Sequence, residues 1–152
     1  MAGTLKEQLR ADLNAARRER DKFRTTLLTT TLADLRNREI ELRRDAADAD
    51  VVEVLGRAIR KRREAAEQMR AAAGAARPAS VEEAARKEER EAELLAAYLP
   101  PGLDEAEVRA MVRAAIAGGA QNIGAIMSAI MPGLKGRFDG REANRIAREE
   151  LG

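Results

Sequence analysis

Residues 98–103 read Tyr-Leu-Pro-Pro-Gly-Leu, and this stretch determines how the chain is divided. Proline has no backbone N–H and disfavours the helical conformation in the residue before it. A helix that approaches from the N-terminal side must therefore end near Leu99. We expect a first domain over residues 1–99, a linker over 100–102 and a second domain over 103–152.

The residues before this break carry apolar side chains at helical spacing. Leu5, Leu9 and Leu13 recur every four residues, behind a capping box formed by Thr4 and Glu7. Further starts are expected at Asp21, at Asp48 or Asp50, and at Ser80 with Glu83, and Gly74 ends the third helix. The pattern predicts an antiparallel helical hairpin inside a small bundle.

The residues after the break have a different pattern, with short apolar runs between glycines. Asp104 and Asn122 are expected to begin two short helices, the second ending at Pro132-Gly133. Asp139 is expected to cap the last helix, over residues 141–151. No strand is predicted anywhere, so the fold class is all-α: an N-terminal bundle followed by a small three-helix domain.

Composition excludes several kinds of chemistry. The chain of 152 residues has no Cys and no His, which removes thiolate nucleophiles, Cys-based zinc sites and the commonest general base. We assign no catalytic residue, no cofactor and no metal site. No run reaches the roughly 20 apolar residues of a membrane span, and no apolar signal core is present, so we expect a cytoplasmic protein without membrane partners.

Charge is unevenly distributed along the sequence. The net charge is only +2, yet residues 1–77 hold 18 basic and 13 acidic side chains. Residues 78–110 hold 4 basic and 9 acidic side chains, and residues 111–152 hold 6 and 4. The chain is thus basic, then acidic, then basic again.

A dense basic cluster is a first candidate for phosphate binding. Five cations lie within about two helical turns: Arg57, Arg60, Lys61, Arg62 and Arg63. The alternative is a solvated helix face whose charges pair with neighbouring glutamates at helical spacing. Arg62 lies on the apolar stripe and is either a buried ion pair or a group that faces a ligand.

A second candidate is the loop Lys135-Gly136-Arg137 before the last helix. Free amides and the helix dipole favour anions at a helix N-terminus, and the two cations add charge. The alternative is an ordinary turn between helices, with Gly133 as a left-handed C-cap. Because the chain has only three aromatic residues, it has no platform for stacking single-stranded bases, and a structured RNA fits better.

The C-terminal half resembles the GatB/YqeY family. The residues that carry the resemblance are Tyr98-Leu99-Pro100, Asn122–Pro132 (NIGAIMSAIMP), Lys135–Gly140 (KGRFDG) and Asn144. In the N-terminal half, Arg57 and Arg62 match an Arg-x-x-x-x-Arg spacing of the stand-alone members, after Val54-Leu55. The resemblance covers essentially the whole chain.

The resemblance implies a two-domain helical protein related to the tail of the amidotransferase B subunit. That enzyme amidates Glu-tRNA(Gln) or Asp-tRNA(Asn) with glutamine as donor, and its tail domain contacts the tRNA body. The family-level activity is a carbon–nitrogen ligase, although this chain is too short for the catalytic domain. The leading hypothesis is tRNA binding through the two basic clusters, including Gly136 and Asn144. The alternatives are a non-catalytic adaptor for an amidotransferase or aminoacyl-tRNA synthetase, and an enzyme acting alone.

Overall fold

The structure is a computed structural model that describes residues 3–152. Across those residues it contains seven helices and no strand, which confirms the all-α prediction. None of these helices has the length and apolarity needed to cross a membrane. The helices are α1 (Leu5–Arg18), α2 (Lys22–Leu42), α3 (Asp48–Ala73), α4 (Ala79–Ala96), α5 (Glu105–Ala117), α6 (Ile123–Leu134) and α7 (Gly140–Leu151).

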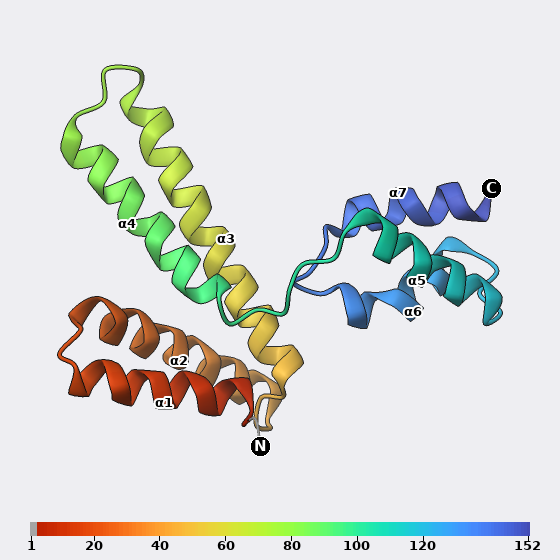
Figure 1. The fold of residues 1–152 in the computed structure, drawn as a ribbon, viewed down its shortest axis with the longest axis horizontal. Helices are drawn as coiled ribbons and strands as arrows, with labels where there is room; N and C mark the ends of the chain where they lie inside the picture. Colours follow the sequence, from red (N-terminus) through yellow and green to blue (C-terminus); the bar gives the residue numbers. More distant parts are fainter. Residues whose placement is uncertain (1–2) are drawn as a thin grey trace. The chain divides into compact units, whose positions relative to one another are not determined.

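The helices belong to two compact units, with the boundary between Tyr98 and Leu99. Unit 1 contains α1 to α4, and unit 2 contains α5 to α7 (Figure 1). Of the expected domain 1–99, Met1 and Ala2 lie outside the described residues. The expected linker residues 100–102 fall within unit 2, where Pro101 accepts a hydrogen bond from Arg137 Nε at 3.0 Å.

Most helix starts follow the expected side-chain caps. Thr4 and Glu7 form the capping box of α1, and Asp104 and Glu107 form that of α5. The side chains of the other expected caps, Asp21, Asn122 and Asp139, each accept a first-turn backbone N–H. These bonds satisfy donors that a helix start otherwise leaves unpaired.

The expected start of α4 at Ser80 is wrong. The helix begins one residue earlier, at Ala79, and the residue before it is Pro78 with φ −65° and no side-chain cap. Proline fixes φ near the helical value and has no N–H to satisfy, so it begins a helix without help from Ser80.

The end of α6 is also later than expected. The helix continues through Pro132 to Leu134, because a proline this near the end removes only its own hydrogen bond. Gly133 is therefore helical and is not the left-handed cap. A Cβ on Gly133 would lie 2.8 Å from Cε of Met111, so the glycine allows α5 to approach. The left-handed glycine of this segment is Gly136, with φ 73°.

Unit 1 is built from two helical hairpins, α1–α2 and α3–α4, which Figure 1 shows as two pairs of neighbouring helices. Their core is aliphatic, and its largest fully buried members are Leu9, Leu28, Leu35, Val51, Leu55 and Leu95. The hydroxyl of Tyr98 donates a hydrogen bond to Asp12 of α1. Burial and this bond raise the pKa of Tyr98 above its usual value, so the phenol stays protonated at neutral pH.

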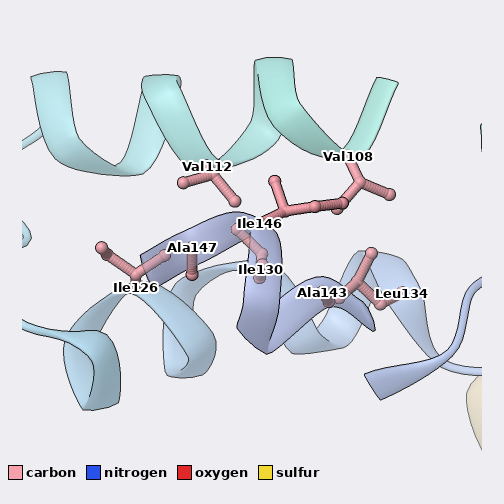
Figure 2. Close-up of a cluster of buried hydrophobic side chains, with 8 residues drawn as sticks. All are labelled: Val108, Val112, Ile126, Ile130, Leu134, Ala143, Ile146 and Ala147. Carbon is pink, nitrogen blue, oxygen red and sulfur yellow. The ribbon is translucent and has the colours of Figure 1, made fainter. Parts of the chain in front are cut away.

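Unit 2 has its own core, formed by one stripe from each helix (Figure 2). Val108 and Val112 of α5 face Ile126, Ile130 and Leu134 of α6 and Ala143, Ile146 and Ala147 of α7. The alanines let α7 lie close to its neighbours. This core places one face of α7 inward and leaves the opposite face to solvent.

Replacing Ile146, which is 0% exposed, with alanine should lower the free energy of unfolding of unit 2 by about 2–4 kcal/mol. The physical reason is the lost burial together with the cavity left in the core. Urea denaturation and amide exchange along α7 measure it. The matched control is Ile40→Ala, because Ile40 is 66% exposed and should change stability by less than about 0.5 kcal/mol. Equal losses in the two variants would contradict this assignment of the core.

Candidate functional site

The five cations predicted on α3 do not form one surface. Arg57, Lys61 and Arg62 line a groove of about 530 Å³ between α2, α3 and α4. Arg63 lies on another side of the helix, in a hollow that also contains Arg70. Arg60 is exposed and lines neither hollow. Residues that are adjacent in sequence are spread around the circumference of a helix.

Acidic side chains neutralise much of this cluster. The groove holds four acidic residues for its four basic ones, and they are Asp34, Glu41, Glu88 and Glu91. Arg57 pairs with Glu53, with 2.6 Å between Nη2 and Oε1. The hollow beside Arg63 is lined by Glu67, Glu89 and Glu93. A polyanion at α3 would meet carboxylates beside these cations.

Arg62 makes the ion pair that was one of its two alternatives. Its Nε lies 2.9 Å from Oε2 of Glu91, and its Nη1 donates to the Ala58 carbonyl at 3.1 Å. The two side chains are only 14% and 19% exposed. Arg62 therefore holds α3 against α4.

A second set of ion pairs joins α3 and α4 further along the hairpin. Arg70 contacts Glu82 at 3.0 Å and Glu89 at 2.5 Å. Hydrogen bonds to the guanidinium lower the pKa of both glutamates, and the same bonds raise the pKa of Arg70. The acidic helix α4 is thus largely a charge partner for α3.

In unit 2, arginines and glutamates form a network between α5 and α7. Arg109 of α5 contacts Glu150 and Glu105 at 2.8 Å and Glu149 at 2.9 Å. Arg113 contacts Glu150 at 2.8 Å, and its hydrogen bond is the main reason that the pKa of Glu150 falls to about 2. Arg145 of α7 completes the network through Glu105, Glu142 and Glu149.

The cations outside this network are left without carboxylate partners. Lys135, Arg141 and Arg148 are exposed and make no ion pair with any residue in the range 3–152. Arg141, Asn144 and Arg148 are spaced i, i+3, i+7, so they share one side of α7. We call Lys135, Arg141, Asn144 and Arg148 the α7 basic face.

The other two residues predicted in the loop have structural contacts. Arg137 donates from Nε to the Pro101 carbonyl at 3.0 Å, and its own carbonyl accepts from Leu103 N–H at 2.9 Å. Gly136 has the positive φ that the turn requires. Both residues position the segment that carries Lys135.

Arg141 and Arg148 were missed by the sequence reasoning. The signal was present, because they flank Asn144 at helical spacing on an amphipathic helix. The sequence could not show which arginines of α7 pair with α5, since Arg145 lies between Arg141 and Arg148, and its three glutamate partners include one on α5. Ion pairing across helices separates Arg145 from Arg141 and Arg148.

The helix beside α7 carries no charge at all. From Ile123 to Leu134 every residue of α6 is uncharged, and its exposed residues are small or short: Gly124, Ala125, Ser128, Ala129 and Pro132. α6 packs directly against α7. A ligand backbone at the α7 basic face would meet no acidic side chain from α6.

The arrangement of titratable groups favours binding by charge. Among residues 3–152 there is no group of three acidic side chains placed to hold a metal ion. The carboxylates of Glu105, Glu142, Glu149 and Glu150 are all engaged by arginines. What unit 2 offers to a ligand is therefore cationic.

Comparison with known proteins identifies the family. The chain matches the sequence model of the family described as "Yqey-like protein" over residues 6–151. The protein therefore belongs to the YqeY-like family, as the resemblance indicated. No curated protein matches the chain.

Acid should destabilise unit 2 through Glu150. Because the folded-state pKa, about 2, lies below the ordinary value of 4.5, the unfolded chain takes up the proton first as pH falls. The stabilisation is complete above about pH 5 and is lost as pH falls toward 2. Thermal unfolding between those pH values measures it. Glu150→Gln should weaken the dependence and the exposed Glu83→Gln should not, and an unchanged profile in Glu150→Gln would refute the assignment.

The Arg62–Glu91 pair should stabilise unit 1 more than an exposed pair does. Arg62→Gln should cost about 1–2 kcal/mol, because it leaves a half-buried carboxylate without its partner. Arg57→Gln is the control, since Arg57 is 57% exposed and its pair with Glu53 should contribute less than about 1 kcal/mol. A double-mutant cycle by urea denaturation measures the coupling. Zero coupling between Arg62 and Glu91 would show that the contact is not stabilising.

Proposed function

We propose that unit 2 binds the phosphate backbone of a structured RNA through the α7 basic face. The observation that supports this most directly is the separation of charges on α7. Arg145 is held by three glutamates, whereas Arg141 and Arg148, each about one turn away along the same helix, are exposed and have no acidic partner in the described chain. Cations kept apart from carboxylates are available to phosphates.

The physical gain is the release of counterions. Each phosphate that a Lys or Arg neutralises frees condensed cations, which makes affinity strongly dependent on salt and nearly independent of sequence. Unit 2 holds seven basic and seven acidic residues from Leu99 to Gly152, so its total charge gives no attraction. The attraction comes from the cations of the α7 basic face, which make no ion pair with a described residue, while the glutamates of α7 are paired with arginines.

Structured RNA suits this surface better than a single strand. A single strand is held by aromatic side chains on which bases stack, and the aromatic residue of unit 2, Phe138, is packed against the core. Phosphates and ribose hydroxyls of a folded RNA require only cations and polar groups such as Asn144.

Transfer RNA is the RNA that the family resemblance implies. The residues that resemble the amidotransferase tail, Asn122–Pro132 and Lys135–Gly140, form α6 and the turn into α7. We propose that the chain shares tRNA with an amidotransferase or an aminoacyl-tRNA synthetase, as a binding protein.

The test replaces three cations of the face at once. Lys135→Gln/Arg141→Gln/Arg148→Gln should weaken binding of bulk tRNA at least tenfold at about 0.1 M salt. The slope of log affinity against log salt should fall by about two to three units, roughly one for each lost contact. Filter binding or fluorescence anisotropy at several salt concentrations gives both numbers.

The matched control removes the same charge elsewhere. Arg60→Gln/Lys61→Gln/Arg63→Gln also lowers the net charge by three, but on α3, where Lys61 and Arg63 line hollows that glutamates share. Its affinity should stay within about threefold of the wild type. Equal affinity in all three proteins, with circular dichroism showing that each is folded, would reject the proposed site.

A further inference from the structure

The turn between α1 and α2 carries a group of four cations without carboxylate partners in the part of the chain that the structure describes. Arg17, Arg18, Arg20 and Lys22 lie within six consecutive residues, and all four are exposed. None of them makes an ion pair with any residue from 3 to 152.

The acidic residues of the same turn are already engaged. Glu19 accepts a hydrogen bond from Arg24 at 2.9 Å. Asp21 caps α2 by accepting from the Arg24 backbone N–H at 3.1 Å. Arg24 thus donates hydrogen bonds to both carboxylates of the segment, Glu19 and Asp21. The four cations beside them remain available to an anionic ligand.

The backbone of the turn is fixed. Glu19 N–H donates to the Ala15 carbonyl and Asp21 N–H donates to the Ala16 carbonyl, each at 2.9 Å. Arg20 has φ 58°, a conformation in which glycine or asparagine is the usual residue. Arg20 thus occupies a left-handed position where glycine is commonest. The backbone hydrogen bonds hold this turn in one conformation, and the cations project from it.

A fifth cation reaches the turn from α4. The guanidinium of Arg90 lies 5.5 Å from the centre of the Phe23 ring, in a cation–π contact. Phe23 directly follows Lys22, so this contact fixes a charge from a segment distant in sequence beside the turn. Arg90 also makes no ion pair with a described residue. We call Arg17, Arg18, Arg20, Lys22 and Arg90 the basic turn.

We propose that the basic turn is a second contact site for RNA phosphates, in unit 1, separate from the α7 basic face. This inference rests on the proposed RNA binding and adds a site to it. Five cations that make no ion pair with a described residue match a polyanion and carry no means of reading bases. Phe23 lies under Arg90 and is not available for stacking, so the contact is to the backbone of a folded RNA.

An anionic membrane surface is the weaker match. Helices that dock on membranes insert large apolar side chains beside their cations. The exposed large apolar residue of the α1–α2 hairpin is Ile40, which lies at the opposite end of α2. The basic turn therefore offers charge without an apolar anchor.

The test uses the full chain, bulk tRNA as the probe and three triple variants. Arg17→Gln/Arg18→Gln/Lys22→Gln should weaken binding at least tenfold and lower the salt slope by about two to three units. The α7 triple variant described above reports on unit 2. The Arg60→Gln/Lys61→Gln/Arg63→Gln variant removes the same charge from unit 1 and should change affinity by less than about threefold.

The outcomes separate the two proposals. If the basic-turn variant binds like the wild type while the α7 variant is weakened, the second site is wrong and the proposed function stands. If neither variant is weakened, both fail. If the α3 variant loses as much as the basic-turn variant, the RNA responds to total charge and the basic turn is not a site. Binding to vesicles with 30% phosphatidylserine, without tRNA binding, would also overturn the proposal.

A second measurement does not depend on neutralising charges. The chain has no cysteine, so a single Arg18→Cys or Gln68→Cys substitution can carry a photo-crosslinker at a unique position. Gln68 is exposed on α3, away from the turn, and serves as the control. The proposal requires that Arg18→Cys crosslinks to tRNA more than Gln68→Cys, and equal yields would overturn it.

Discussion

Pairing between arginine and glutamate on neighbouring helices is the interaction on which this structure depends. Two of its largest inter-helix contacts, α3 with α4 and α5 with α7, are joined by arginines that reach across to glutamates: Arg62 and Arg70 in unit 1, and Arg109 in unit 2. The cores beneath these pairs consist mostly of Leu, Val, Ile and Ala. Such residues pack in many registers, whereas a charged pair with a few fixed partners selects one.

The same pairing decides which cations can meet a ligand. A glutamate that bonds an arginine on another helix is held in place and cannot neutralise a cation elsewhere on the surface. On α7 this holds Glu149 and Glu150 toward α5, through Arg109 and Arg113. At the start of α2, Arg24 holds Glu19 in the same way. A chain with a net charge of only +2 therefore presents local surfaces that are strongly cationic.

Sequence reasoning predicted the helices well but could not show which surface charges are paired, for a physical reason. Caps such as Thr4, Asp104 and Asp139 act within four residues, and that range can be read directly from sequence. The errors at Ser80 and Gly133 are also local. Pro78 begins α4 without a side-chain cap, and α6 continues through Pro132 to Leu134. Surface charge depends on contacts over long separations, such as the 29 residues between Arg62 and Glu91. The five cations on α3 stand out in the sequence because they are close together. Their spacing does not reveal which carboxylates of α4 lie opposite them.

The two proposed contact sites lie in separate units, which would affect how a folded RNA is selected. Either set of phosphate contacts alone is weak and sensitive to salt, and any polyanion can satisfy it. When the α7 basic face and the basic turn engage one molecule, the second contact becomes intramolecular and gains from the high effective concentration. That gain requires an RNA that can reach both surfaces at once, so size and shape can be read without contacts to bases. A chain with 28 cations, 26 acids and three aromatic residues has the groups for this kind of recognition.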